Sequence, residues 1–308
     1  MKNIIVTGGA GFIGGEIVRQ LSDREDVERI FVLDKISPQS RKEQIEGVSD
    51  KIFLYKLDIS KKESWLFGNI DFVINCAAET HVDRSIASAY PFIDSNITGT
   101  LRALEFCREK NIKMLQVSTD EVYGSIKEGS ATEDSPRLAK NPYAATKLAA
   151  ESLCESFFNT YKSKIVITRG SNTYGSWQHE EKLIPTVIKK ALSNEKIPVY
   201  GDGSNIRQWL SVKDHARGII KVLFEGLAGE VYNIGGDFSC NNLVIVKKIL
   251  GLLGKSESLI SFVEDRKGHD WRYSIDTNKI KNELGWINEV DFDNGLHETV
   301  EWFSSCKY

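Results

Sequence analysis

A tyrosine and a lysine stand four residues apart, Tyr143 and Lys147, in the segment NPYAATKLAAE. Asn141 and Pro142 predict the start of a helix, and the residues that follow are strong helix formers. Side chains at this spacing share one helix face. A phenol, whose reference pKa is about 10, becomes a base at neutral pH where a nearby cation lowers that pKa, and a lowering of about 3 units requires roughly 4 kcal/mol. The pair therefore predicts proton transfer by Tyr143.

The same spacing occurs a second time, at Tyr123 and Lys127. Gly124 and Ser125 follow Tyr123 directly, and such residues are typical of a turn. We therefore expect the second copy to lie outside a helix, and we assign the chemistry to Tyr143 and Lys147.

Two adjacent carboxyls, Asp120 and Glu121, stand in STDEVYG just past a predicted strand at 114–118. Ligands of open α/β sheets bind beyond the carboxyl ends of the strands, where such a pair can exchange protons with a substrate. A solvated turn is the alternative reading. Neighbouring side chains on a strand point to opposite faces. Both carboxyls can therefore face one substrate only if the backbone leaves the pleat by residue 119 or 120.

A glycine-rich turn, TGGAGFIGG, separates the first predicted strand from the first helix and predicts a dinucleotide site. Its glycines provide a tight turn, a close approach of backbone to pyrophosphate and close packing of helix on strand; they are Gly8, Gly11 and Gly14. Asp34 follows 20 residues after Gly14, at the end of the second strand. Its carboxylate favours NAD over NADP, a preference that the adjacent Lys35 weakens. Asp58 is expected either to accept from adenine or to cap the next helix.

The elements that position these residues alternate between strand and helix, which predicts a doubly wound, Rossmann-type parallel sheet. Strands are expected at 2–7, 30–34, 52–57, 72–75, 114–118 and 165–169, with helices at 96–110 and 142–162. After residue 172, helices at 182–193, 212–226 and 241–253 alternate with short strands. We predict an NAD-binding domain over 1–172 and a smaller, partly interleaved α/β substrate domain over 173–308, with some segments returning to the first.

Composition excludes several classes of protein. The 308 residues carry 40 Lys and Arg against 43 Asp and Glu, a formal charge of -3, which argues against a broad nucleic-acid surface. No apolar run approaches the roughly 18 residues of a membrane span. The opening MKNIIVTGGAGFIGG predicts a strand and turn instead of a signal peptide, so we expect a cytoplasmic protein.

The cysteines and histidines predict neither a disulfide framework nor a metal site. His81 and His269 lack metal-ligand spacing with any other His or Cys, so we expect no metal. No CxxC pair occurs among the five cysteines, which we expect to be reduced packing residues: Cys76, Cys107, Cys154, Cys240 and Cys306.

Taken in order, these motifs resemble the dTDP-glucose 4,6-dehydratases of the extended short-chain dehydrogenase/reductase superfamily. The likeness extends from residue 3 to about residue 276 and is carried by TGGAGFIGG, AAETHVDRSI, STDEVYG, NPYAATK, EKLIPTVI, GDGSNIRQWLSVKDHARGI, YNIGG and DRKGHDWRYSID. The segment SNTYGSWQHEEKL departs from the family, because Thr173 stands where a second Asn is usual and the usual prolines are missing. The loop from Gly124 to Asn141 is also shorter than in many members.

The resemblance implies a three-step reaction with NAD as a returned catalyst. Tyr143 would take the proton of the sugar C4 hydroxyl while hydride passes to NAD. Glu121 would then remove the C5 proton while Asp120 protonates the departing C6 hydroxyl, and the hydride returns to C6. Thr119 would hydrogen-bond the C4 oxygen, and Lys147 would hold both the ribose and Tyr143.

Matching positions imply two sets of binding residues. The cofactor would be lined, besides the glycines, Asp34, Lys35, Tyr143 and Lys147, by Phe12, Ile13, Asp58, Ile59, Ala77, Ala78 and Ser95. The sugar nucleotide would contact Thr80, His81, Thr119, Asn172, Lys182, Leu183, Tyr200, Arg207, Asn233, Asp265 and His269. Arg207 would clamp the pyrophosphate, because a guanidinium pairs bidentately with phosphate oxygens.

Three alternatives stay open. The first is a UDP-glucose 4,6-dehydratase. The bases of the two substrates, thymine and uracil, differ in one methyl group, and discrimination by one methyl amounts to only about 1–3 kcal/mol. A 4-epimerase or a decarboxylase needs Tyr143, Lys147 and NAD but no acid for a C6 hydroxyl, so Asp120 beside Glu121 discriminates against both; GDP-mannose dehydratases usually lack that Asp. A non-catalytic NAD-sensing protein on the same fold is the third.

Helices 96–110 and 142–162 carry apolar residues beyond one stripe, which predicts a homodimer through this pair of helices. The residues are Leu101, Leu104, Phe106, Leu148, Leu153, Phe157 and Phe158.

Overall fold

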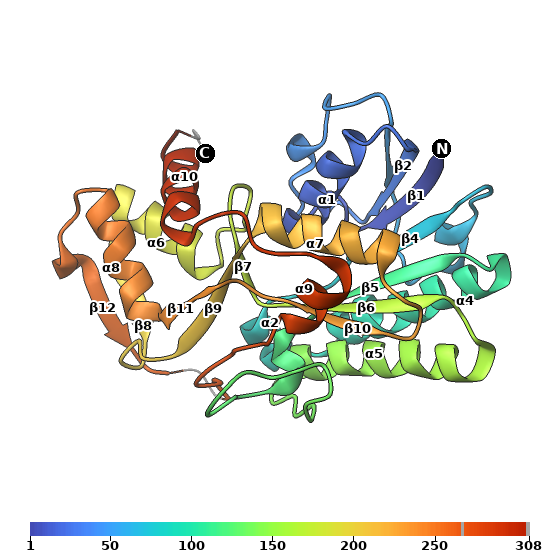
Figure 1. Ribbon diagram of the computed structural model, residues 1–308. Helices are drawn as coiled ribbons and strands as arrows, with labels where there is room; N and C mark the ends of the chain where they lie inside the picture. Colours follow the sequence, from blue (N-terminus) through green and yellow to red (C-terminus); the bar gives the residue numbers. More distant parts are fainter. Residues whose placement is uncertain (266–267, 306–308) are drawn as a thin grey trace.

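The computed structural model describes residues 1–265 and 268–305 and divides into two lobes (Figure 1). Cys306, and the Arg-Lys pair at 266–267 within the motif DRKGHDWRYSID, lie outside the described residues. The larger lobe is built on a seven-stranded parallel sheet of order β10-β6-β5-β4-β1-β2-β3. Its strands are β1 (Lys2–Thr7), β2 (Val27–Asp34), β3 (Ile52–Lys56), β4 (Phe72–Asn75), β5 (Lys113–Thr119), β6 (Ile165–Gly170) and β10 (Val231–Ile234). The predicted doubly wound sheet is confirmed.

Helices cover both faces of this sheet. On one face α1 (Phe12–Ser22) packs against α7 (Val212–Glu225), and the buried aliphatic residues of both belong to one core. On the other face α4 (Gly99–Lys110) and α5 (Pro142–Tyr161) lie side by side (Figure 1). Strand β10, helix α7 and the short helix α9 (Asn278–Leu284) follow residue 172 in the chain yet complete this lobe.

The smaller lobe has its own apolar core between two small sheets and three helices. Its sheets have the strand orders β11-β9-β7 and β12-β8. The strands are β7 (Asn172–Tyr174), β8 (Ile197–Tyr200), β9 (Ile206–Ser211), β11 (Phe238–Asn241) and β12 (Ile260–Val263). Helices α6 (Leu183–Leu192), α8 (Asn242–Leu252) and α10 (Phe292–Ser305) supply the remaining core side chains. The chain begins in one lobe and its C-terminal helix lies in the other (Figure 1).

Short elements connect these parts. They are the 3-10 turns η1 (Lys42–Gln44), η2 (Lys62–Trp65), η4 (Asp120–Tyr123) and η5 (Glu257–Leu259), the helices α2 (Val82–Ala87) and α3 (Tyr90–Phe92), and the π-helical turn η3 (Ile93–Thr98). The helix predicted from residue 96 therefore begins as a π-helical turn before it becomes α-helical at Gly99. Asn111, in the left-handed conformation with φ 54°, ends it. The predicted helices at 142–162, 182–193, 212–226 and 241–253 agree with α5, α6, α7 and α8 within one or two residues.

A line of buried polar side chains crosses the centre of the sheet. The Thr7 hydroxyl donates to Asn75 Oδ1 at 2.7 Å, and Asn75 Nδ2 donates to Gln116 Oε1 at 2.8 Å. These side chains are at most 1% exposed. The Thr7 oxygen also accepts from the backbone N–H groups of Cys76 and Ala77, each at 3.1 Å. Strands β1, β4 and β5 are thereby fixed in register where their carboxyl ends meet.

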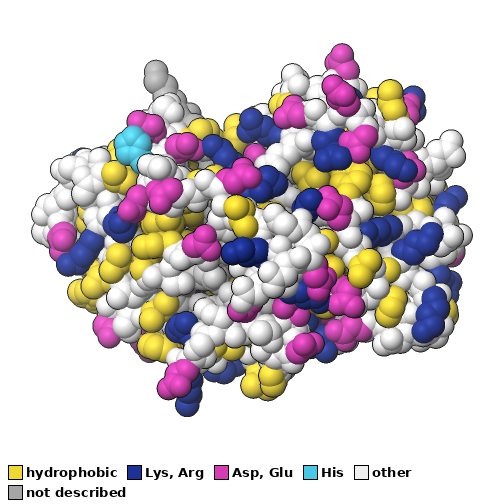
Figure 2. Space-filling model, in the orientation of Figure 1, with side chains coloured by type: hydrophobic (Ala, Val, Ile, Leu, Met, Phe, Trp, Pro, Cys, Tyr) yellow, Lys and Arg dark blue, Asp and Glu magenta, His cyan; other side chains and the backbone are white. Residues whose placement is uncertain are grey.

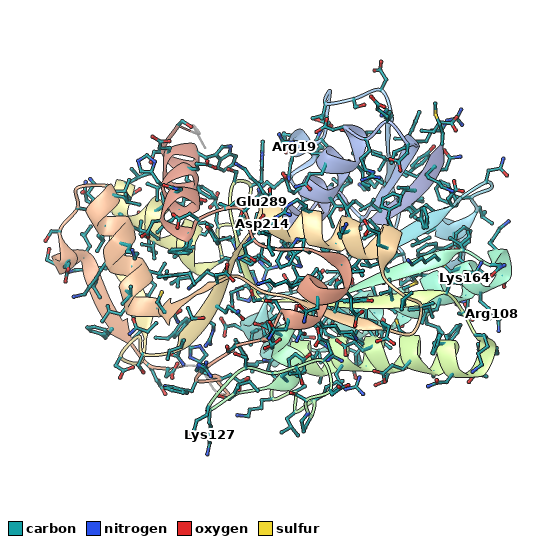
Figure 3. All side chains as sticks on the ribbon, viewed as in Figure 1. Arg19, Arg108, Lys127, Lys164, Asp214 and Glu289 are labelled. Carbon is teal, nitrogen blue, oxygen red and sulfur yellow. The ribbon has the colours of Figure 1, made fainter. Side chains whose placement is uncertain are left out.

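The two lobes are joined at the start of α7. Asp214 is 2% exposed, and its carboxylate accepts the backbone N–H groups of Glu289, at 3.2 Å, and Val290, at 2.9 Å. Arg217 also donates to it at 2.6 Å. Asp214 and Glu289 lie together where the chain passes from α9 toward α10 (Figure 3).

On the face shown in Figure 2, Lys and Arg side chains intermingle with Asp and Glu side chains. Across residues 1–265 and 268–305, none of the helices combines the length and apolar character that a membrane crossing requires.

Gly14 tests the requirement for close backbone approach. A Cβ there would overlap the Gly8 carbonyl oxygen, a backbone atom that cannot step aside. We expect Gly14→Ala to lower the free energy of unfolding by about 2–4 kcal/mol, measured by denaturant titration. Gly251 on α8 is the matched control, because a Cβ there meets nothing within 4 Å. Gly251→Ala should gain about 0.5–1 kcal/mol; equal effects of the two variants would contradict the packing argument.

Candidate active site

A cavity of about 580 Å³ opens at the carboxyl ends of β1, β2, β4, β5 and β6. Ligands of doubly wound sheets bind at this edge, where the strand order reverses between β1 and β4. All the predicted cofactor residues except Lys147 line this cavity: Gly8, Gly11, Phe12, Ile13, Gly14, Asp34, Lys35, Asp58, Ile59, Ala77, Ala78, Ser95 and Tyr143.

The glycine-rich turn forms a cradle that other residues would fill. Gly8 has φ +65°, and a Cβ on it would lie 2.7 Å from the Cα of Ala77. Helix α1 begins at Phe12, directly after Gly11, which makes no side-chain cap. Backbone N–H groups at the start of an uncapped helix attract anions. The residues present therefore fit the pyrophosphate of a dinucleotide.

Two aspartates end the strands beside this cradle. Asp34 is 7% exposed, and its carboxylate accepts from Ala10 N at 3.1 Å, Ile36 N at 2.8 Å and Ser40 Oγ at 2.9 Å. The anion is thus held in place facing the cavity, as ribose recognition requires. Asp58 lines the cavity, so its contact with adenine stays a prediction. The helix-cap alternative is wrong, because Asp58 Oδ1 accepts from Ser60 N at 2.9 Å in the preceding turn, whereas Lys61 precedes η2 and makes no side-chain cap.

The catalytic turn has the backbone geometry that two converging carboxyls require. Strand β5 ends at Thr119 and the 3-10 turn η4 begins at Asp120, so the backbone leaves the pleat at that point. Thr119, Asp120 and Glu121 all line the cavity together with Tyr143. Glu121 Oε2 also accepts from Asn141 Nδ2 at 3.1 Å, which connects the turn to the start of α5. The solvated-turn alternative is wrong for Asp120, which is 3% exposed.

Asp120 has the electrostatics of a proton donor. Burial, together with the neighbouring Glu121 carboxylate, raises the pKa of Asp120 to about 8. The Thr119 hydroxyl donates to Oδ1 at 3.2 Å. Among the described residues, Oδ2 is buried and has no hydrogen-bond partner. A carboxyl in these surroundings is protonated at pH 7 and can give its proton to a leaving group.

Tyr143 and Lys147 lie on α5 as predicted, but their expected coupling is wrong in this structure. Burial and the negative charge of Glu121 raise the pKa of Tyr143 instead of lowering it. Burial lowers the pKa of Lys147, whose Nζ donates to Val117 O at 2.6 Å beneath the cavity floor. The ammonium is thus anchored to β5, and Lys147 does not line the cavity. The hydroxyl of Thr119 is the neighbour that lowers the pKa of Tyr143.

The second copy of the tyrosine–lysine spacing forms no pair. Tyr123 ends η4 and is buried, whereas Lys127 is exposed and projects away from the molecule (Figure 3). The expectation that this copy lies outside a helix is confirmed.

The predicted sugar-nucleotide residues fall into two groups and two outliers. Thr80, His81, Thr119, Asn172 and Lys182 line the cavity. The second group lies in the smaller lobe, where Arg207 Nη2 lies 3.0 Å from His269 Nε2 and His269 Nδ1 lies 2.6 Å from Asp265 Oδ1. The ring of Tyr200 packs edge-on against His269.

Arg207 connects the second group to the carboxyls. Asp120 and Glu121 are both close enough to act on its charge, and its guanidinium packs 4.4 Å from the ring of Tyr273. Two predicted residues lie elsewhere. Leu183 begins α6 and packs on the core of the smaller lobe. Asn233 is fully buried, with its amide held by Tyr123 and Ala131.

Sequence reasoning missed several polar residues of the site. Tyr273 donates to Asp270 at 2.9 Å, and Lys140 pairs with the same buried aspartate at 3.1 Å. At the cavity mouth Arg84 forms an ion pair with Glu181. These residues lie within or beside the motifs DRKGHDWRYSID, NPYAATK, AAETHVDRSI and EKLIPTVI, so proximity to a motif was the only signal. Within the described residues, His, Cys, Asp and Glu side chains do not gather in threes that could hold a metal ion.

The sequence and the fold of this chain are similar to those of known proteins. The sequence model of the GDP-mannose 4,6-dehydratase family matches residues 5–299. The low-salt glycan biosynthesis protein Agl12 of Haloferax volcanii is 44% identical over 98% of this chain and 98% of its own. A dTDP-glucose 4,6-dehydratase of Actinoplanes sp. is 43% identical over 97% of each chain. A crystal structure of dTDP-glucose 4,6-dehydratase from Streptomyces venezuelae with NAD bound superposes with a TM-score of 0.96 at 40% identity, covering 98% of this chain and 97% of that one.

The raised pKa of Asp120 predicts a pH-dependent stability. In the folded protein this carboxyl holds its proton up to pH about 8, whereas in the unfolded chain it loses it near pH 3.9. Its contribution to stability is therefore fully present below pH about 4 and is lost as the pH rises through about 8. Asp120→Asn removes the titration. The free energy of unfolding of the variant, relative to wild type, should increase by up to roughly 4 kcal/mol between pH 5 and pH 8.5. A constant difference would show that Asp120 is ionised in the folded state.

Proposed function

Because this chain belongs to the GDP-mannose 4,6-dehydratase family, we infer that it is an NAD-dependent hydro-lyase that converts dTDP-glucose into the 4-keto-6-deoxy sugar nucleotide. Several relatives at about 40% identity and nearly full coverage are dTDP-glucose 4,6-dehydratases. The observation that carries this function is the buried Asp120 carboxyl beside Glu121, in the same cavity as Tyr143; burial raises the pKa of Asp120 to about 8. Bound NAD, held by the glycine cradle and Asp34, would supply the acceptor and later the donor of the hydride.

The first step, oxidation at C4, is proposed for Thr119, Tyr143 and Lys147. Tyr143 would accept the proton of the C4 hydroxyl, and the Thr119 hydroxyl beside it would stabilise the phenolate. Burial raises the pKa of Tyr143, so the base is competent only when further positive charge reaches the cavity. Lys147, which lies one turn along the same helix and whose Nζ donates to Val117 O at 2.6 Å, is proposed to hold the ribose of the cofactor, as the resemblance implies.

The second step, loss of water, is proposed for the carboxyl pair. Glu121 would take the C5 proton that the new 4-ketone has acidified, and Asp120 would donate its proton to the departing C6 hydroxyl. Both carboxyls line one cavity, and burial raises the pKa of Asp120 to about 8, which suits that carboxyl to the role of the acid. Arg207 is proposed to bind the pyrophosphate, because its guanidinium lies close to both carboxyls and to His269.

The remaining sugar-nucleotide residues are proposals of unequal support. Thr80, His81, Asn172 and Lys182 line the cavity, and Tyr200, Asp265 and His269 surround Arg207. Leu183 would need its backbone groups to reach a substrate, because its side chain packs on the core of the smaller lobe. Asn233 lacks such support, because it is fully buried and both its amide and its backbone N–H are bonded within the chain. An epimerase or decarboxylase would share the oxidation step, yet it would have no use for a buried, protonated Asp120.

The acid assignment is tested by Asp120→Asn. This variant should transfer the first hydride but lose water 10²–10⁴-fold more slowly, since one acid–base group is missing. Rapid mixing with dTDP-glucose should therefore show reduced-cofactor absorbance that builds up and persists. Tyr143→Phe is the control and should show no such build-up, because the first step is blocked.

Mass analysis of the product from dTDP-glucose, UDP-glucose and GDP-mannose gives the base preference of the wild type. A wild-type rate of 4-keto-6-deoxy product from Asp120→Asn would refute the assignment of the acid. Steady accumulation of reduced cofactor by wild type would instead indicate a plain dehydrogenase.

The domain and compartment assignments are also proposals. The first domain is proposed to be NAD-binding over 1–172 and the second to bind the sugar nucleotide over 173–308, with β10, α7 and α9 returning to the first lobe. The unpaired thiols of Cys107 and Cys154 are buried in one core, which fits a reducing, cytoplasmic location.

A homodimer through the outer faces of α4 and α5 is proposed on a smaller set of residues than the sequence indicated. Leu104, Phe106 and Phe157 are buried within the chain itself and cannot form the contact. Half-buried apolar residues remain at Leu101, Leu148, Leu153 and Phe158.

Light scattering at micromolar protein should give about twice the chain mass of 34.7 kDa. Ser152→Arg on the exposed face of α5 should yield monomers, because it places a bulky charge in the contact. Ser304→Arg on α10 is the matched control, since both hydroxyls donate to the carbonyl four residues earlier. A monomeric wild type rules the dimer out.

A further inference from the structure

A buried ion pair that the proposed chemistry does not use lies between α5 and β6. Arg169 donates to the Glu151 carboxylate from Nη2 at 2.8 Å and from Nε at 3.1 Å. The two side chains are 1% and 0% exposed. Burying two charges costs several kcal/mol per ion, and the pair adds little net stability over apolar side chains of the same volume. Its geometry therefore calls for an explanation other than stability.

The pair continues into a buried hydrogen-bond network. Arg169 Nη1 donates to Tyr123 Oη at 2.6 Å and to Glu133 O at 3.0 Å. Tyr123 Oη donates in turn to Asn233 Oδ1 at 2.8 Å. Asn233 N donates to Glu133 Oε1 at 2.8 Å. Burial raises the pKa of Tyr123 to about 12, so this hydroxyl keeps its proton and can donate. Tyr123 is the junction of the network, accepting from one side and donating to the other.

The two ends of the network lie on the two elements that carry the catalytic groups. Glu151 follows Lys147 by one helical turn on α5, the helix that also carries Tyr143. Tyr123 is the last residue of η4, whose first two residues are Asp120 and Glu121. The path from Glu151 through Arg169 to Tyr123 therefore connects helix α5, which carries the residues proposed for oxidation, to the turn η4, which carries those proposed for elimination. The three side chains of this path do not line the cavity.

We propose that Tyr123 and Arg169 are positioning residues that hold the Asp120–Glu121 turn in register with Tyr143, so that one bound sugar meets both groups. This inference rests on the proposed function. Helix α5 has an independent anchor, because Lys147 donates to Val117 O at 2.6 Å. Near its start, η4 is connected to the beginning of α5 by the hydrogen bond from Asn141 to Glu121, whereas its end is connected to the middle of α5 through the Tyr123 hydroxyl, Arg169 and Glu151. Loss of that hydroxyl should therefore disturb elimination while oxidation continues.

The test is Tyr123→Phe, which keeps the buried ring and removes one oxygen. With dTDP-glucose we expect the first hydride transfer within about 2-fold of wild type and KM within about 3-fold. Water loss should slow roughly 10–100-fold, the size of effect that a small misplacement of reacting groups produces. Rapid mixing should show transient reduced-cofactor absorbance that wild type does not accumulate.

Tyr232→Phe is the matched control, because it also removes the hydroxyl of a buried tyrosine. Tyr232 lies on β10, next to Asn233, and its Oη donates to Glu283 at 3.0 Å, away from the cavity. It should lower the thermal midpoint without changing the balance of the two steps. If Tyr123→Phe does not fold, Arg137→Met replaces it. Arg137 lies 3.5 Å from Glu151 at the half-exposed edge of the network, so the same accumulation of reduced cofactor is expected at a smaller amplitude.

The outcomes separate two failures. A wild type that makes no 4-keto sugar overturns the proposed function itself. An active wild type overturns the positioning role if the variant slows both steps in parallel, or if it only loses thermal stability as Tyr232→Phe does.

Discussion

The hydrogen bonds among Thr7, Asn75 and Gln116 hold three central strands in register near the carboxyl edge of the sheet. The loops that carry the functional residues all begin at this edge, because parallel strands end on the same side of a sheet. The glycine cradle follows β1, the Ala77–Ala78 segment follows β4 and the catalytic turn follows β5. A shift of one residue in any of these strands would move its loop by about 3.3 Å, a large displacement against hydrogen-bond tolerances.

Charge in the site is organised by burial. Asp120 and Tyr143 both sit where water is excluded, so both favour their neutral forms, and Glu121 reinforces that preference in each. The same exclusion keeps Lys147 on a backbone carbonyl. A neutral Asp120 can donate its proton, and a neutral Tyr143 becomes a base when positive charge reaches the cavity. Burial thus favours the neutral form of both groups, although their reference pKa values, about 3.9 and about 10, lie far apart.

Sequence patterns predicted the sheet, the helices, the glycine cradle and the polar residues at the strand ends because each depends on local spacing, whereas the resemblance implied the other predicted cavity residues. Glycines before a helix, an aspartate 20 residues later and polar residues after a strand all report their own geometry. The patterns failed where a contact joins distant segments. Lys147 was expected to act on Tyr143, yet its ammonium binds Val117, 30 positions earlier. Asn233 was assigned to the substrate, yet its amide binds Tyr123, 110 positions earlier. No role was predicted for Arg169 on β6, because its partner Glu151 lies on a different element, helix α5.

The carboxylate of Asp214 has a consequence for biosynthesis. It holds the backbone at Glu289 and Val290, the segment that crosses from α9 to α10. Strand β10 closes one edge of the large sheet, and α10 closes the core of the smaller lobe. Neither core is complete until almost the whole chain has been synthesised, because Ile280 of α9 belongs to the core of the larger lobe and α10 supplies that of the smaller one. A stop codon shortly before residue 289 would leave Asp214 without both backbone partners.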